Sequence, residues 1–373
     1  TGLSAIWRKR TPKFNESERN STYNVTVAGL QGLHLDLGDG AKLPLLTGSE
    51  VKQALSYGRF EINGYPKWFW SVVREHEEVA LEEFRKILAA AGVGAVSADK
   101  ADELIRHLSD APPAVQSGLG GALWEFATRS VSVGSSTLEA ALTCAVSDGK
   151  SVDQGAFEDE ACSRLFLSFR DPLPTLGAFT STANAEEQQA RSELEARIHE
   201  MTCLRSNAVV WGLFWLLHYP AAFGTRWEYW RKSEQRAAEE FMFDLAAYIG
   251  EDRQSYLKAT AESGTGGLKV LSALYEWVLS VVRESEDVAH KDGRVYHINA
   301  RESAQRLRDS LLPAIASAKS QAAYEVLDGL RRKANGARAK YIRHLQFKMR
   351  EEEAYSAPVA QQNYTKFERD FAP

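Results

Sequence analysis

Residues 185–219, AEEQQARSELEARIHEMTCLRSNAVVWGLFWLLHY, form the longest helical pattern in the sequence and decide its fold class. The first half, residues 186–205, is charged and amphipathic, whereas residues 209–217 are almost entirely apolar. A bilayer crossing needs about 20 apolar residues, and this run is far shorter before His218 and Pro220. The pattern therefore predicts one long helix whose second half is buried on several sides.

Helical periodicity continues over most of the chain from Ser49 onward. Pro66 stands where it can open a helix over residues 68–91, because its fixed φ suits a first turn. Further helices are predicted at residues 97–109, 112–131, 136–147, 154–169, 226–249, 252–262, 267–289, 299–316, 319–333 and 337–353. Many helices joined by short turns favour stacked helical hairpins. We therefore predict an all-α fold of the α-solenoid type, with HEAT-like hairpins.

The N-terminal part differs, because residues 24–28 and 33–37 alternate between apolar and polar side chains. This alternation, followed by a Gly-Asp-Gly sequence, predicts one or two short strands. Residues 1–22 are polar and are expected to be poorly ordered or to belong to a missing neighbour. The predicted regions are an N-terminal tail with the strands (1–48), a first part of the helical array (49–171), a linker loop (172–184), a second part of the array (185–353) and an extended C-terminal tail (354–373).

Composition indicates a soluble folded protein, since hydrophobic residues make up 44% of the 373 residues and charged residues 25%. The formal net charge of −5 gives no whole-chain preference for nucleic acid or anionic membrane. Cys144, Cys162 and Cys203 are odd in number and form no CxxC pair, which favours reduced thiols in a cytoplasmic protein. The chain starts at Thr1 and no apolar signal sequence follows, so we expect a fragment of a larger cytoplasmic protein.

Two pairs of short stretches carry a resemblance to a known family. The first pair is LHLDLGDG at residues 33–40 with FEINGYPKWFW at residues 60–70. The second is SAQRLRDSLLP at residues 303–313 with AAYEVLDGL at residues 322–330. Both resemble segments in the helical C-terminal regions of large bacterial NACHT-type STAND NTPases, and the resemblance would cover residues 30–353.

The resemblance implies a non-catalytic sensor or interaction module. In that family an ATPase module drives switching or oligomerisation, the helical array senses or holds a partner, and bacterial members often act in antiviral defence. The ATPase would lie outside this chain, so no ATP-binding residue is assigned. The implied partner is a protein or another part of the same parent chain, and no cofactor is expected.

No residue pattern predicts a catalytic, cofactor-binding or metal site. Residues 263–269, SGTGGLK, lack the spacing and the preceding strand of a phosphate loop, which favours a turn between helices. His199 and Cys203 share a helix face at a spacing that zinc accepts, but no second ligand pair accompanies them. Aromatic residues crowd into positions 211–230, and Trp211 and Trp215 share one helix face. They predict a buried structural core; the alternative is a ligand-stacking groove in an all-α enzyme.

The most unusual charge pattern lies between Gly329 and Arg350, where eight basic residues occur without an acidic one. They are Arg331, Arg332, Lys333, Arg338, Lys340, Arg343, Lys348 and Arg350. Contacts with phosphates would add affinity through counterion release. Alternatively, these long side chains cover a final helix pair and residues 351–353 partly neutralise them. A nucleic-acid-binding helical protein therefore stands as the second functional hypothesis, and no membrane partner is predicted.

An internal similarity completes the sequence pattern. Residues 71–80, SVVREHEEVA, match residues 280–289, SVVRESEDVA, at eight of ten positions. Helices in equivalent places of a stacked array face similar neighbours and so acquire similar sequences. The similarity predicts two helical segments with buried valines and with Arg74 and Arg283 exposed.

Overall fold

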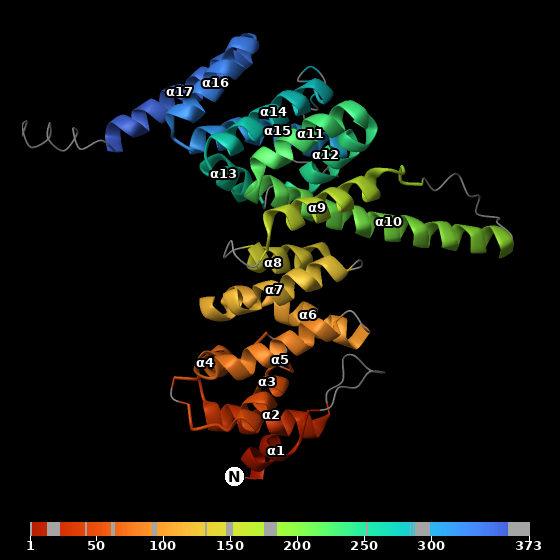
Figure 1. The fold of residues 1–373 in the computed structure, drawn as a ribbon, viewed down its shortest axis with the longest axis vertical. Helices are drawn as coiled ribbons and strands as arrows, with labels where there is room; N and C mark the ends of the chain where they lie inside the picture. Colours follow the sequence, from red (N-terminus) through yellow and green to blue (C-terminus); the bar gives the residue numbers. More distant parts are fainter. Residues whose placement is uncertain are drawn as a thin grey trace, which may run out of the picture. The chain divides into compact units, whose positions relative to one another are not determined.

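The computed structural model describes residues 2–12, 23–41, 43–60, 64–91, 95–130, 133–146, 152–174, 185–250, 253–283, 285, 287 and 299–356. Within these ranges the regular structure is helical and no β-strand occurs (Figure 1). The prediction of an all-α fold is therefore confirmed for the described residues. The chain divides into two compact units, unit 1 (residues 1–156) and unit 2 (residues 157–373). This division precedes the segment at 172–184 that the sequence suggested as a linker.

Unit 1 consists of helices that pack largely in chain order. They are α1 (Gly2–Lys9), α2 (Asn24–Leu37), α3 (Gly48–Gly58), α4 (Lys67–Glu75), α5 (Glu77–Ala90), α6 (Ala95–Arg106), the 3-10 turn η1 (Leu108–Asp110), α7 (Pro113–Arg129) and α8 (Ser135–Val146). The closest packing joins α1 to α2, α5 to α7 and α7 to α8 (Figure 1). Packing between helices that are close in sequence is consistent with a stack of helices.

Unit 2 contains most of α9 (Gln154–Phe169) and all later helices. These are α10 (Ala185–His218), α11 (Pro220–Ser233), α12 (Gln235–Ile249), α13 (Gln254–Glu262), α14 (Thr265–Val281), α15 (Ala300–Ser317), α16 (Gln321–Lys333) and α17 (Gly336–Ser356). Helix α15 packs against α12, α13 and α14, while α16 and α17 pair with each other. Because α17 runs to Ser356, the predicted extended tail is wrong for residues 354–356, and residues 357–373 lie outside the described ranges.

The apolar half of α10 forms the core of unit 2. Trp211 and Trp215 are buried, with 2% or less of either residue exposed, as predicted. The Trp211 ring lies 5.4 Å from that of Phe157 on α9, and the Trp215 ring 5.7 Å from that of Phe223 on α11. The other half of α10 is mostly exposed and extends beyond the neighbouring helices (Figure 1). Over the described ranges, no helix has the length and apolarity to cross a bilayer.

The strands predicted at residues 24–28 and 33–37 are wrong, because both segments belong to α2. The buried residues of α2 include Thr26, Leu30, Leu33 and Leu37, whose spacings of four and three residues define one helix face. Within each short segment the apolar side chains also alternate, so either period fits locally. Gly32 lets α1 approach α2 closely, since a Cβ atom there would collide with the Leu3 backbone of α1.

The predicted disordered tail is also wrong for residues 2–9, which form α1 against α2. Asp36 on α2 holds α1 in place by accepting hydrogen bonds from Ser4 Oγ at 2.8 Å and from Trp7 Nε1 at 2.9 Å. Arg8 Nη1 pairs with the same carboxylate at 2.5 Å. Burial acts to raise the pKa of Asp36, but the bonds from Trp7, Ser4 and Arg8 outweigh it and lower that pKa.

Two predicted helices are each divided in the structure. The helix expected over residues 68–91 breaks at His76, where φ is −126° and ψ 46°, and so becomes α4 and α5. The helix expected over residues 226–249 breaks at Glu234, with φ −137° and ψ 55°, between α11 and α12. Neither break contains Gly or Pro, so the sequence carries no ordinary stop signal at either position.

The predicted internal repeat is not supported, because its two copies differ in conformation. Residues 71–80 are helical on both sides of His76, but α14 ends at Val281 and Val282 is extended, with φ −117° and ψ 92°. Arg74 and Arg283 are both exposed, as predicted. Residues 284, 286, 288 and 289 lie outside the described ranges. The helical prediction for the second copy is therefore wrong from Val282 onward in the part described.

Replacing Trp211 by Ala should lower the free energy of unfolding by about 3–5 kcal/mol, because a large side chain leaves a cavity in a packed core. Urea denaturation followed by far-ultraviolet circular dichroism measures the change. Tyr229→Ala is the matched control, since 65% of Tyr229 is exposed, and it should cost less than about 1 kcal/mol. A similar small loss for Trp211→Ala would contradict the assignment of a core role.

Asp36→Asn should detach α1 from α2, because the amide removes the charge that Arg8 pairs with and one acceptor oxygen. The expected loss is about 1–3 kcal/mol, measured as faster hydrogen exchange of the α1 amides. The pKa of Asp36 is lower in the folded state than in the unfolded chain. The stabilisation that the Asp36 carboxylate gives to the folded protein is therefore complete above the ordinary carboxyl pKa, and it disappears as the pH falls through the lower folded-state value.

Glu78→Gln is the control for that experiment, because Glu78 is exposed on α5. It should leave α1 exchange unchanged at every pH. Equal exchange in the Asp36→Asn variant and the unmodified protein would show that the Asp36 contacts do not hold α1.

Candidate functional site

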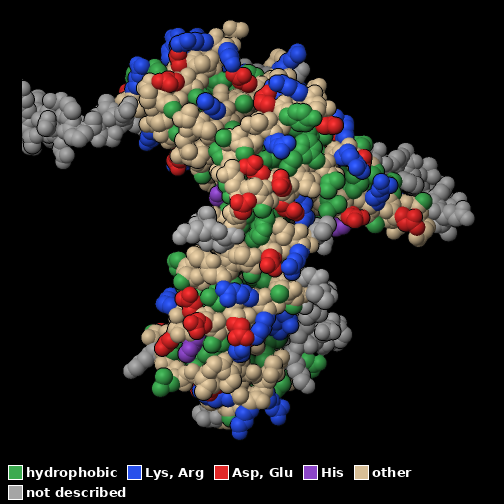
Figure 2. Space-filling view, in the orientation of Figure 1, with side chains coloured by type: hydrophobic (Ala, Val, Ile, Leu, Met, Phe, Trp, Pro, Cys, Tyr) green, Lys and Arg blue, Asp and Glu red, His purple; other side chains and the backbone are tan. Residues whose placement is uncertain are grey.

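The predicted basic surface belongs to the end of α16 and to α17. Figure 2 shows Lys and Arg side chains over this end of unit 2, with acidic side chains between them. Helix α17 buries Ile342, Leu345, Gln346 and Met349, and it packs against α15 and α16. These positions recur at helical spacing, so the opposite face of α17 is turned outward.

Three of the eight basic residues have their charge compensated at the end of α16. Arg331 and Arg332 both pair with Asp328, at 2.5 and 2.7 Å. Lys333 Nζ lies 2.6 Å from Glu276 Oε1 on α14. These pairs lower the pKa of Asp328, chiefly through the hydrogen bond from Arg331. The charges of Arg331 and Arg332 are therefore compensated within α16, and Lys333 links α16 to α14, so these three residues offer less free charge to a ligand.

Two further arginines pack against aromatic rings. The Arg338 guanidinium lies 5.7 Å from the centre of the Tyr275 ring. The Arg350 guanidinium lies 4.5 Å from the centre of the Tyr324 ring, and its Nη2 donates to the Tyr324 hydroxyl at 2.6 Å. Cation–π contacts of this kind hold helices together. For Arg338 and Arg350, the structure therefore favours the alternative in which the basic side chains cover the last helices.

Lys340, Arg343 and Lys348 are different, because they are exposed and have no ion-pair partner among the described residues. Their spacing of three and five residues places them on the outward part of α17. Tyr341 and Phe347 stand between them and are 44% and 57% exposed. Aromatic rings interleaved with cations are the combination that binds single-stranded nucleic acid. The sequence pattern drew attention to the cations but missed these two rings.

The other motifs have structural explanations. The SGTGGLK segment is the turn between α13 and α14 with the first turn of α14, as predicted, and Gly264 adopts φ 103°. Cys203 Sγ and His199 Nε2 lie 3.8 Å apart on α10. No group of three or more side chains able to hold a metal ion occurs within the described ranges.

The aromatic cluster of unit 2 packs against itself. Trp227 lies 4.6 Å from Trp277 at an interplanar angle of 84°, which is an edge-to-face contact. Trp230 lies 5.5 Å from Phe241, and all four of these residues are buried. This arrangement is that of a structural core, with the aromatic faces covered by other rings.

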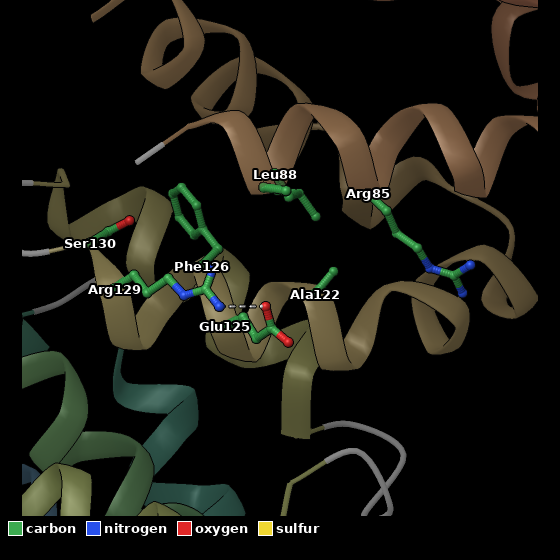
Figure 3. Close-up of a pocket in the computed structure, with 8 residues that line it drawn as sticks. Arg85, Leu88, Ala122, Glu125, Phe126, Arg129 and Ser130 are labelled. Atoms are coloured by element: carbon green, nitrogen blue, oxygen red, sulfur yellow. Dashed lines mark ion pairs between the residues drawn. The ribbon is translucent and has the colours of Figure 1, made fainter. Parts of the chain in front are cut away.

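A groove of about 520 Å³ lies between α5 and α7 in unit 1 (Figure 3). Leu88 on α5 and Phe126 on α7 lie on opposite sides of it, with Arg85 near one end and Arg129 near the other (Figure 3). Arg85 Nη2 donates to the Gly118 carbonyl at 2.8 Å, and Arg129 pairs with Glu125 at 3.1 Å. Both guanidinium groups are thus engaged within the protein, and the groove surface is of mixed polar and apolar character.

Comparisons of the chain with models of known protein families, with curated proteins and with solved structures find no match. The protein is therefore defined at the level of its all-helical fold. The resemblance to the helical regions of NACHT-type STAND NTPases is carried by the quoted sequence stretches alone.

Proposed function

We propose that this chain is a non-catalytic helical interaction module that holds a protein partner. The observation that carries the proposal is an apolar row on the outward side of α2. Tyr23, just before α2, and Val27 and Leu35 on it are 46%, 45% and 66% exposed; they recur at multiples of four residues, with exposed Gln31 at the remaining position of the row. The opposite side of α2 packs against α1 and α3.

The partner proposed for this row is an amphipathic helix of another protein. Rows of apolar side chains at four-residue spacing pack into the grooves of a second helix. The exposed face of a helix is ordinarily polar, whereas Tyr23, Val27 and Leu35 make part of this one apolar. A partner helix laid along α2 would remove these three side chains from water and extend the packing order of unit 1.

A role within a larger STAND-type NTPase is the more specific form of this proposal. It rests on the resemblance of the stretches at residues 33–70 and 303–330, and on helix packing in chain order, which is compatible with a HEAT-like solenoid. In such a protein, a separate ATPase module would respond to the partner that the helical array binds, and the whole protein would act in bacterial antiviral defence. An ATPase module in the gene that encodes the chain is the observation that would support this form.

A photo-crosslinking amino acid at position 35 should join this chain to a helical segment of one partner protein in the cells that produce it. Val27→Glu should abolish that crosslink by placing a charge in the apolar row, without lowering the unfolding midpoint, because Val27 is partly exposed. Mass spectrometry of the crosslinked peptides identifies the partner segment.

The same crosslinker at position 167 is the matched control, since Leu167 on α9 is also 66% exposed. It should capture no common partner. A crosslink at position 35 that survives Val27→Glu, or that occurs equally at position 167, would exclude the α2 row as the docking surface.

Nucleic-acid binding through α17 is the second candidate, favoured by exposed Lys340, Arg343 and Lys348 beside exposed Tyr341 and Phe347. Reversing the three cations to Glu should weaken binding of a 20-nucleotide oligouridylate. Because each phosphate contact on a single strand contributes about 0.7 to the salt slope, the slope should become shallower by about 2. Fluorescence anisotropy over a range of salt concentrations measures it.

The control is a variant of the same net charge, in which Arg74, Lys269 and Arg283 are changed to Glu; these residues are exposed on other helices or loops. That variant should retain the original slope. Equal weakening in both variants would indicate a nonspecific charge effect and would exclude α17 as a nucleic-acid interface.

A further inference from the structure

Unit 1 contains a second pocket, with a volume of about 430 Å³, bounded by α3, α4, α5, α6 and the segment after α1. Small-molecule sites are usually concave, largely apolar, and between about 300 and 1,000 Å³ in volume. The size therefore suits a small organic molecule. Its chemistry is set by which polar groups line it.

One face of α3 and the residue after it supply polar groups to the pocket. Lys52, Ser56 and Arg59 all line it, and their spacing of four and three residues brings them to the same side of the helix. Lys52 is already engaged, since its Nζ lies 3.1 Å from Glu83 Oε1 on α5. Glu83 also pairs with Lys86, so that carboxylate is neutralised within the protein.

Arg59 has no such partner. Within the described residues, no carboxylate lies at ion-pair distance from its guanidinium, which lies 5.2 Å from the centre of the Phe60 ring. Burial lowers the pKa of Arg59, and the charge of Glu103 nearby opposes that shift. A partly buried guanidinium without a close anion is costly unless something else compensates it.

Tyr65 adds a second donor to the same pocket. Its hydroxyl makes no hydrogen bond to a described residue, and burial, with the nearby charge of Glu103, raises the pKa of this group so that it keeps its proton. The Tyr65 ring is stacked on that of Phe69, with 3.9 Å between centres and 8° between planes. Phe69 and Phe84 also line the pocket and give it an apolar wall beside the donors.

We propose that this pocket binds a small organic anion, a carboxylate or a phosphate ester with a compact apolar body. The anionic head would accept hydrogen bonds from Arg59 and from the hydroxyl groups of Tyr65 and Ser56. The apolar body would lie against Phe69 and Phe84. Arg59 supplies the charge that selects an anion, because the other two cations that line the pocket are engaged: Lys52 is paired with an acidic side chain, and Lys100 has an interaction partner within the protein.

Isothermal titration of the full chain with phenyl phosphate and with benzoate tests the proposal and separates the two head groups. At least one of these anions should bind, and benzyl alcohol, which has a similar body without charge, should bind at least about tenfold more weakly. Arg59→Gln should weaken the preferred anion at least about tenfold. Inorganic phosphate should bind more weakly than phenyl phosphate, because it lacks the apolar body.

Arg129→Gln serves as the matched control, since Arg129 is an exposed arginine of unit 1 outside this pocket. It should leave the affinity unchanged. The proposal is overturned if Arg59→Gln binds as the unmodified protein does, if Arg129→Gln loses affinity equally, or if benzyl alcohol binds as tightly as the anions.

Two milder substitutions keep the test decisive should Arg59→Gln fail to fold. Tyr65→Phe removes only the hydroxyl, and Ser56→Asp introduces a negative charge at the same face of α3. Ser56→Asp should abolish binding of the anion, and Tyr65→Phe should weaken it severalfold, with the circular dichroism spectrum retained. Unchanged affinity in both variants would also overturn the proposal.

Discussion

Unit 2 depends on how closely α10 approaches its neighbours. At Gly212 a Cβ atom would lie 2.7 Å from the Phe241 ring of α12 and 3.3 Å from Leu165 of α9, so the absence of a side chain lets the three helices meet. Trp211 and Trp215 on either side of this glycine then fill the space between helices. Because protein interiors are close-packed, even one added methyl group at this contact would force the helices apart.

Helical periodicity was sufficient to predict most helices. It failed where the sequence also fitted the alternating pattern of a strand, and where a helix breaks without a local stop signal. In α2 the apolar side chains also alternate with polar ones over short stretches, and the need for Gly32 at the α1 contact is not visible from local sequence. The breaks at His76 and Glu234 contain neither Gly nor Pro. Helical periodicity on both sides of each break therefore predicts one helix where the structure has two.

Charge patterns in the sequence identified candidate residues but not their partners. The run of basic residues near the C-terminus was evident, yet only the structure separates Arg331, whose charge Asp328 compensates, from Lys340, which remains exposed. Similarly, the spacing of Ser56 and Arg59 is readable on one helix, whereas Tyr65 joins them only through the fold. Long-range contacts decide which polar groups are available to a ligand.

The two halves of α10 have a mechanical consequence. The helix is 34 residues long, and its mostly exposed part, residues 188–202, would measure about 22 Å at the usual rise per residue. It is continuous with the half that holds Trp211 and Trp215, and no break separates the two. The exposed part and the buried part of α10 therefore move as one rigid helix. A force applied at the exposed end exerts a torque on the aromatic core, and a small rotation of the core displaces that end by a larger distance.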